Sequence, residues 1–413
     1  MLIRRRALLA GAAALSAPAL IRSVRAQAPG TIRIGVLTDL SGPYRDVGGP
    51  TSVACARQAA EEFTAANPGI KVEVVAADHQ NKPDVGSAIV REWFDRGEVD
   101  LVTDINNSAL AIALRSLAEE HDKIELVTSA GSSDLTGKYC SSNLLHWSWD
   151  SWCLAHSTGT ALVKAGGDKW FFVTPDYAFG HAMQDDTAKF VQQAGGKVVG
   201  SIAYPFPSTT DFSSFLLQAQ SSGANVVAFT SSGTDLANCI KQANEFGLTQ
   251  GGDIRLAAMI GYITDVRTLG LQAAQGLVMT ETFYWDLNDR TRAFMARIRP
   301  KLGADVFPNM SHVGNYSGVL DYLKAAKQLG VAQAKASGKA VLEVMRSRPA
   351  DDDCFGASTI RADGRVIHPA YLFQVKTPAE SRSPGDVYKL IATTPADQAF
   401  RPLSDGACPL VRS

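Results

Sequence analysis

The sequence predicts an α/β fold with two lobes, each a doubly wound parallel sheet covered by helices. Short apolar runs alternate with amphipathic helical segments, which is the pattern of strand–helix–strand units in a parallel sheet. The alternation starts again near residue 150, which favours two similar sheets over one very large sheet. With 413 residues, 46% of them hydrophobic, the chain is also long enough for two cores.

The first set of elements occupies residues 32–128. One segment shows the helical pattern clearly, because Val53, Ala56 and Phe63 fall on one face and Asn67-Pro68-Gly69 ends the helix. Strands are predicted at residues 32–37, 72–76, 99–103 and 124–128, and helices at 51–66, 84–96 and 107–119.

The second set begins with a helix at 150–164. Its predicted strands are residues 169–174, 198–203, 225–230 and 255–259, with residues 276–280 closing the series. The last third departs from this pattern: it contains two helices, at 290–302 and 313–329, and a hairpin over 359–375. Asp363-Gly364 is expected at the hairpin turn, and a tail rich in Pro and Ser follows.

The N-terminus has the three parts of a secretory signal peptide. Arg4, Arg5 and Arg6 precede an apolar run over residues 7–20, and small residues allow cleavage after Ala26. We therefore assign residues 1–26 to the signal peptide and expect a periplasmic protein. The arginines permit either Sec or twin-arginine export, and no later segment has the length of a membrane helix.

The formal net charge of −1 argues against a nucleic-acid partner. Six cysteines, an even number, suit an oxidising compartment, and their spacing matches no zinc pattern. Cys55 and Cys239 lie in apolar helical patterns and are expected as buried thiols. The disulfide candidates are Cys140, Cys354 and Cys408, and their pairing is left open.

Catalytic motifs are absent from the sequence. It contains no G-x-G-x-x-G after a strand, no Walker loop and no G-x-S-x-G, since residues 314–318 have the wrong spacing. The histidines are scattered; His146 and His156 stand ten apart and are expected to be surface or hydrogen-bonded residues. We therefore expect no catalysis, no metal and no cofactor.

Polar and aromatic residues gather where the predicted strands end. In open parallel sheets, ligands bind beyond the carboxyl ends of the strands, so these segments predict a binding site. Hydroxyls and free N–H groups at a helix start suit an anion, although Ser108 has the alternative role of a helix cap. The candidates are Tyr44, His79, Asn107, Ser108, Ser129, Ala130, Tyr177, Phe179, Thr234, Asp235 and Gly261.

Aromatic residues also cluster where the chain is expected to cross between the lobes. Trp149 and Tyr284 belong to two such clusters, at residues 147–152 and 283–285. We include both as candidate ligand contacts, with hinge packing as the alternative.

In order along the chain, these segments resemble the periplasmic substrate-binding proteins of branched-chain amino-acid-type (Leu/Ile/Val-binding-like) ABC transporters. The resemblance covers the whole chain after the signal peptide. Its motifs are Ile34-Gly35-Val36-Leu37, Ser41-Gly42-Pro43-Tyr44, Asp78-His79-Gln80-Asn81-Lys82-Pro83-Asp84, Asp134-Leu135-Thr136-Gly137-Lys138, Asp176-Tyr177-Ala178-Phe179-Gly180 and Gly233-Thr234-Asp235.

The resemblance implies the type I periplasmic-binding fold, with a three-segment hinge and discontinuous lobes. We assign residues 31–147 and 282–352 to the first lobe, and 148–281 and 353–413, including the tail, to the second. It further implies that Ser108-Ala109 and Ser129-Ala130 hold a ligand carboxylate and that Phe179 covers the ligand. The implied partner is a membrane permease, and we expect a monomer.

One departure from the family concerns the ligand. Amino-acid-binding members place an acidic residue after the strand matching 255–259, whereas this chain has no carboxylate there before Asp265. A buried ammonium without a counter-charge is costly. The motifs also resemble those of the aromatic/organic-acid-binding branch of the family, so we expect a carboxylate with an uncharged tail, aromatic in kind. The alternatives are an amino acid or amide bound by Asp235 or Asp265, a ligand sensor, and an exported hydrolase.

Overall fold

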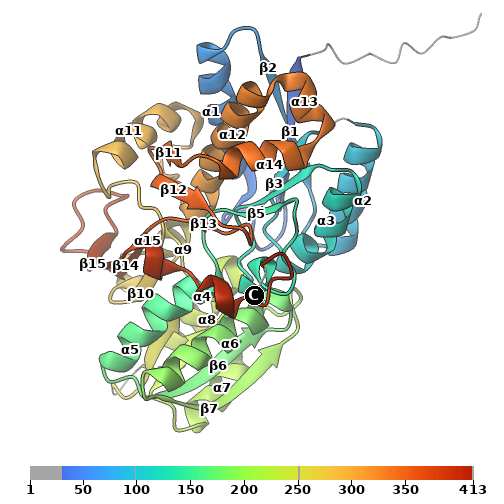
Figure 1. Cartoon of the computed structure of the whole chain (residues 1–413). Helices are drawn as coiled ribbons and strands as arrows, with labels where there is room; N and C mark the ends of the chain where they lie inside the picture. Colours follow the sequence, from blue (N-terminus) through green and yellow to red (C-terminus); the bar gives the residue numbers. More distant parts are fainter. Residues whose placement is uncertain (1–29, 98, 250–251, 412–413) are drawn as a thin grey trace, which may run out of the picture.

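The computed structural model describes residues 30–97, 99–249 and 252–411, so the predicted signal peptide lies outside the described residues. The first lobe is built on a five-stranded parallel sheet (Figure 1). Its strand order is β2 (Lys71–Asp78), β1 (Thr31–Thr38), β3 (Leu101–Asp104), β4 (Ile124–Val127) and β5 (Leu144–His146).

Helices from both ends of the sequence cover this sheet. The N-terminal ones are α1 (Gly49–Ala66), α2 (Pro83–Asp95) and α3 (Ser108–Glu120). The later ones are α12 (Met310–Leu329), α13 (Val331–Ala336) and α14 (Gly338–Arg346). Helix α12 packs along α1 and against β3, so the first lobe is discontinuous in sequence.

The second lobe has a four-stranded parallel sheet, which confirms the predicted restart. Its order is β7 (Lys197–Tyr204), β6 (Lys169–Pro175), β8 (Val226–Phe229) and β9 (Arg255–Ala258). Its helices are α6 (Ala178–Gln193), α7 (Ser213–Ser221), α8 (Gly233–Glu245), α9 (Ile263–Leu269) and α10 (Leu271–Ala274). The two-lobed α/β architecture is therefore the one that the sequence predicts.

Each lobe buries an apolar core between its sheet and its helices. In the first lobe Ile32, Ile34 and Val36 of β1 are fully buried together with Val313 and Val319 of α12. In the second, a cluster around β6 and β8 includes residues such as Val173, Val227, Phe229 and Ile240. The first of these clusters continues between the lobes through Trp149, Phe179 and Tyr262, so apolar packing links the two lobes in this arrangement.

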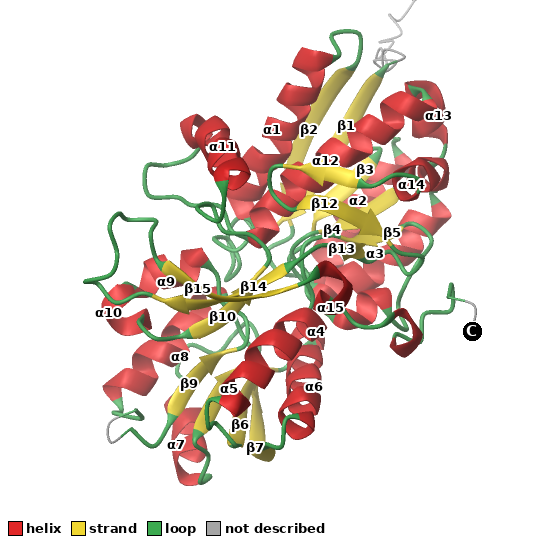
Figure 2. Ribbon diagram, turned by 60° about the vertical axis from the view of Figure 1, so that its left-hand side comes forward, coloured by secondary structure: helices red, strands yellow, loops and turns green. Residues whose placement is uncertain are grey.

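Strand β10 (Val278–Glu281) is where the prediction was wrong. It does not close the parallel series: it pairs antiparallel with β14 (Ala370–Val375), which pairs with β15 (Tyr388–Thr394). Figure 2 shows these three strands between the upper and lower lobes. The chain leaves the second sheet through turns at Gly270 and Gly276, whose positive φ values suit glycine, and its partner comes about 90 residues later.

The predicted hairpin over 359–375 is confirmed only in its first part. Strand β12 (Gly356–Ile360) pairs with β13 (Val366–Ile367) around Asp363-Gly364, and with β11 (Ala350–Asp352) on its other side. Strand β14 then leaves the hairpin for β10. At the turn, the bridge between His146 and Arg365 continues the first sheet beyond β5.

The remaining helices follow the prediction with local interruptions. The helix at 150–164 consists of α4 (Ser151–Leu154), a π-helical turn (Ala155–Gly159) and α5 (Thr160–Lys164). The helix at 290–302 is α11 (Asp289–Ile298) with a 3₁₀ turn (Arg299–Lys301). The tail carries α15 (Ala396–Ala399) and a 3₁₀ turn (Leu403–Asp405). Within the described part of the chain, no helix combines the length and apolarity needed to span a bilayer.

The structure shows which cysteines are bonded and which are free. Cys140 and Cys408 form a disulfide across 268 residues of sequence, whereas Cys354 is a buried free thiol, as are Cys55, Cys153 and Cys239. The bridge ties the tail to the first lobe. The lobe boundaries remain our proposal, with one amendment: the turn around Arg365 and the end of the tail contact the first lobe, although we placed 353–413 on the second.

Candidate ligand-binding site

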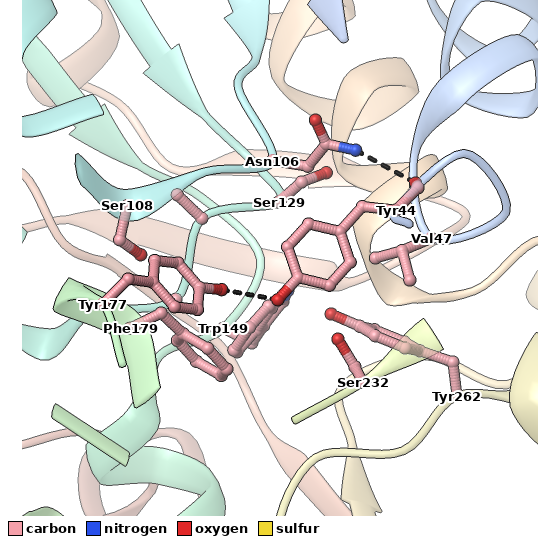
Figure 3. A pocket seen from close by; sticks show the side chains of 12 residues that line it. Tyr44, Val47, Asn106, Ser108, Ser129, Trp149, Tyr177, Phe179, Ser232 and Tyr262 are labelled. Atoms are coloured by element: carbon pink, nitrogen blue, oxygen red, sulfur yellow. Dashed lines mark hydrogen bonds between the residues drawn. The ribbon is translucent and has the colours of Figure 1, made fainter. Parts of the chain in front are cut away.

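A narrow cavity, of about 10 Å³ in this closed arrangement, lies between the two lobes (Figure 3). The first lobe provides the loops at the carboxyl ends of its strands, the second lobe provides the matching loops, and Trp149 comes from the crossover between them. The lining residues are Tyr44, Val47, Asn106, Ser108, Ser129, Ala130, Gly131, Trp149, Tyr177, Phe179, Ser232 and Tyr262. None of these carries a charged side chain.

Half of the predicted site residues line this cavity, and their roles as ligand contacts stay predictions. Those that line it are Tyr44, Ser108, Ser129, Ala130, Trp149, Tyr177 and Phe179. Those that do not are His79, Asn107, Ala109, Thr234, Asp235, Gly261 and Tyr284.

His79 and Asn107 instead support the residues beside them. The His79 Nδ1 accepts the Asn81 N–H (2.9 Å), so its Nε2–H donates to Asn106 Oδ1 (2.6 Å). Asn107 caps α3, since its Oδ1 accepts the Leu110 N–H (3.0 Å). The cap of α3 is therefore Asn107, and Ser108 is left to face the cavity.

The second-lobe candidates that miss the cavity have other partners. The Thr234 hydroxyl reaches the Pro43 carbonyl across the lobes (3.5 Å), and Asp235 accepts a hydrogen bond from the Tyr204 hydroxyl (2.9 Å). Burial raises the pKa of Asp235 to about 6. The Tyr284 hydroxyl donates to the Gly385 carbonyl (2.8 Å). Tyr284 therefore packs within the protein, which agrees with the alternative of hinge packing and not with ligand contact.

Five lining residues were not predicted, and four of them stand within the segments that were. Asn106, Gly131, Ser232 and Tyr262 are each one or two positions from a chosen candidate. Strand ends identify the segment, but the local turn decides which side chain faces inward. Val47 had no sequence signal, because it lies in the irregular loop before α1.

Backbone N–H groups are available at one end of the cavity. The N–H groups of Ala130 and Gly131 have no acceptor among the described residues, while the Ser132 N–H donates to Ser108 Oγ (3.2 Å). These groups, with the Ser108 hydroxyl, can donate to an anion. The Ser129 hydroxyl is already engaged, because it donates to the carboxylate of Asp104.

Asp104 lies beneath this loop and is fully buried. It also accepts hydrogen bonds from the Ser52 hydroxyl (3.0 Å) and the Asn315 amide (3.1 Å). Burial raises the pKa of Asp104, and the hydroxyl donors oppose that rise. No acidic side chain lines the cavity itself. Asp104 therefore lies beneath the loop, where its hydrogen bond with Ser129 holds the loop in place.

Aromatic rings form the opposite walls. The Trp149 ring meets Phe179 edge to face at 5.7 Å and Tyr262 at 6.1 Å between ring centroids. Its Nε1–H donates to Ser311 Oγ (2.9 Å), which holds the ring in place. Such rings present a flat apolar surface to a ligand of similar shape.

The two lobes meet over the cavity. The hydroxyl oxygens of Tyr44 and Tyr177 are 2.6 Å apart, one from each lobe, as Figure 3 shows. Phe206 stacks on both rings, with centroid distances of 5.5 Å to Tyr44 and 4.5 Å to Tyr177. The structure is therefore a closed arrangement, in which both lobes enclose the cavity. No cluster of metal-ligating side chains occurs within the described residues.

Comparison with known proteins identifies relatives of the same shape. A family model described as periplasmic binding protein matches residues 31–382. A periplasmic binding protein from Burkholderia mallei is 40% identical, with 92% of this chain and 99% of that chain covered and a TM-score of 0.87. None of the curated proteins compared with the chain matches it.

Two further structures extend this picture. A branched chain amino acid ABC transporter periplasmic ligand-binding protein from Burkholderia xenovorans LB400 is 36% identical over 92% of this chain and 99% of its own (TM-score 0.79). A solute-binding protein from R. palustris, in complex with benzoate, is 22% identical over 89% and 97% (TM-score 0.75) and shares the fold. From the matched family model and these identities, it follows that the chain belongs to the periplasmic binding protein family.

Proposed function

We propose that this protein is the solute-binding component of an ABC importer and captures a small aromatic carboxylate between its closing lobes. One observation carries the proposal. The cavity combines free N–H groups at Ala130 and Gly131 with walls of Trp149, Phe179 and Tyr262, and has no charged side chain. That lining suits a ligand with an anionic head and a flat, uncharged body.

The magnitudes are compatible with such a ligand. Burying an aromatic ring of about 150–250 Å² contributes on the order of 4–6 kcal/mol. Micromolar affinity requires about 8 kcal/mol, before the cost of association is included. Hydrogen bonds from the N–H groups to the carboxylate, and contacts made on lobe closure, supply the difference.

The amino-acid alternative lacks a carboxylate in the cavity lining to balance the charge of the ammonium. Asp265 is occupied, because Oδ1 accepts the Gly233 N–H (3.1 Å) and Oδ2 accepts the Tyr262 N–H (3.0 Å). Asp235 is bonded to Tyr204. An ammonium in the cavity would therefore be buried without a counter-charge.

Relatives give support of two kinds. The R. palustris protein in complex with benzoate indicates that this fold can enclose an aromatic acid. The B. xenovorans relative is described as a ligand-binding protein of a branched chain amino acid ABC transporter, so the test includes leucine. A periplasmic location, a permease as partner, a monomeric state and the absence of catalysis are parts of the same proposal.

A thermal-shift screen followed by calorimetry tests the proposal. Benzoate, 4-hydroxybenzoate, cinnamate, keto acids and leucine are compared, and an aromatic acid at 100 times its Kd should stabilise the fold by about 2.7 kcal/mol. Replacing the cavity-lining Phe179 (Phe179→Ala) should weaken that ligand. The exposed Phe246 provides the control, since Phe246→Ala should not. Stabilisation by leucine but by no aromatic acid would contradict the proposed ligand class.

A further inference from the structure

His146, in β5, is fully buried beside the loop that carries the free N–H groups. Its Nε2 lies 2.7 Å from the Ala130 carbonyl oxygen. A carbonyl can only accept, so the ring donates its Nε2–H. Burial and the nearby Arg365 guanidinium hold the pKa of His146 well below its usual range, so the ring is neutral with Nδ1 unprotonated.

The bonded carbonyl belongs to the same peptide as the Gly131 N–H. In a trans peptide the C=O and the N–H point in opposite directions. Because His146 binds the carbonyl from the buried side, the Gly131 N–H is directed to the other side of the loop, where Ala130 and Gly131 line the cavity. A hydrogen bond to the oxygen also polarises the peptide and strengthens its N–H as a donor.

The next carbonyl in this loop is fixed as well. The Gly131 oxygen accepts the Ser151 N–H (2.7 Å), and the Ser132 N–H donates to Ser108. The loop therefore has hydrogen bonds on each side of the free N–H. Of the Ala130 and Gly131 carbonyls, that of Ala130 accepts from a side chain and that of Gly131 from a backbone N–H.

We infer that His146 is a positioning residue for anion binding: it holds the Ala130–Gly131 peptide with its N–H toward the ligand carboxylate. This role rests on the proposed function, because it presumes that an anion occupies that end of the cavity. It also assigns a reason for a buried histidine whose second nitrogen has no partner among the described residues.

The chain offers a matched control. His368 is also fully buried and neutral, since burial lowers its pKa to about 4. Its Nε2 lies 3.0 Å from the Trp147 carbonyl oxygen and its Nδ1 3.1 Å from the Pro369 carbonyl oxygen, and the neutral ring donates to one of them. Neither carbonyl is part of the loop with the free N–H groups. Replacing either histidine removes one buried donor, but only His146→Leu releases the peptide at the cavity.

The experiment measures Kd for benzoate and for its neutral analogue benzamide by calorimetry, with Tm measured in parallel. His146→Leu should weaken benzoate about 3- to 10-fold, the effect of one net hydrogen bond, and benzamide by less than about 2-fold. His146→Gln, which retains an N–H at a similar reach, should recover most of the benzoate affinity. His368→Leu should lower Tm but leave the benzoate-to-benzamide ratio unchanged.

An unchanged ratio in folded His146→Leu, or the same change in His368→Leu, would overturn the inference. If His146→Leu does not fold, His146→Asn, whose amide is too short to reach Ala130, is compared with His146→Gln in the same way. If the wild-type protein binds no carboxylate, the proposed function fails first. The Gly131 amide resonance then decides the positioning role: it should shift in the Leu or Asn variant and return in the Gln variant, and no shift would refute it.

Discussion

Substituting Gly131 by alanine should close the cavity from one side. A Cβ built on Gly131 would lie 2.0 Å from Trp149 Cζ3 and 2.9 Å from Phe179 Cε2. The φ angle of Gly131 is outside the left-handed region, so the backbone accepts alanine and the effect comes from the methyl group alone. The two rings, which form the aromatic wall, must therefore move.

The size of the effect follows from how firmly Trp149 is held. Carbon atoms in contact are normally about 3.5–4.0 Å apart, so the indole would have to shift by roughly 1.5 Å. That shift strains its hydrogen bond to Ser311 and its edge contact with Tyr262. Overpacking of this kind costs about 1–3 kcal/mol, which corresponds to roughly 5- to 140-fold in affinity when it falls on the ligand-bound form.

Calorimetric Kd values for benzoate and thermal unfolding measure this directly. Gly69→Ala is the control, because no atom lies within 4 Å of a Cβ at that position and its φ is also ordinary. The control should leave Kd unchanged. If Gly131→Ala kept both the wild-type Kd and the wild-type Tm, Trp149 would not be fixed as described, and the reasoning from the aromatic wall would be refuted.

Three other predictions concern closure, the tail and pH. Tyr44→Phe or Tyr177→Phe removes the hydrogen bond between the lobes and should weaken ligand binding about 2- to 10-fold, chiefly through faster dissociation in stopped-flow measurements. Replacing Cys140 and Cys408 by serine should lower the free energy of unfolding in urea by about 2–5 kcal/mol, because the bridge closes a long loop. Burial raises the pKa of Glu281 to about 8, so the folded state retains a proton that the unfolded state loses from its ordinary pKa upward. Stability should therefore fall as pH rises through about 4.5–8, and Glu281→Gln should reduce that slope in urea titrations.

Each of these has a contrary outcome. Additive effects of Tyr44→Phe and Tyr177→Phe in the double variant would show that the two hydroxyls do not act as one pair. Equal stability of the serine variant and the oxidised wild type would mean that the bridge does not constrain the unfolded chain. An unchanged pH slope in Glu281→Gln would assign the proton uptake to other buried carboxyls, of which Asp265, with a pKa raised to about 7, is the nearest in behaviour.

Local patterns were sufficient to predict most of the fold. The strands of both parallel sheets are short and mostly apolar, and the helices between them carry one apolar face, so the sequence pattern predicts both. The exceptions depend on distant partners. Strand β10 has the same local pattern as the others, yet it pairs with β14, and β15 lies in a tail whose composition predicts only a loop.

The site was predictable to the level of the segment. The rule that ligands bind beyond strand ends led to the loops that carry Ser108, Ser129 and Phe179. The rule predicted Asn107 and Gly261 as site residues, but their neighbours Asn106 and Tyr262 line the cavity. Neighbouring residues in a turn point in different directions, and the rule does not determine which of them faces inward. Asp265 accepts hydrogen bonds from the N–H groups of Gly233 and Tyr262. The sequence could not predict this, because the bond to Gly233 forms only where two loops about 30 residues apart meet.

The bridge between Cys140 and Cys408 has a practical consequence for reporter design. It fixes the C-terminal end to the same lobe that contains β1, so both ends of the folded chain travel together when the lobes move. A donor and an acceptor fluorophore fused to the two termini would keep a constant separation and give no signal on ligand capture. A working optical sensor needs one fluorophore inserted in the second lobe, for example at the turn containing Gly223, where no neighbouring atom approaches.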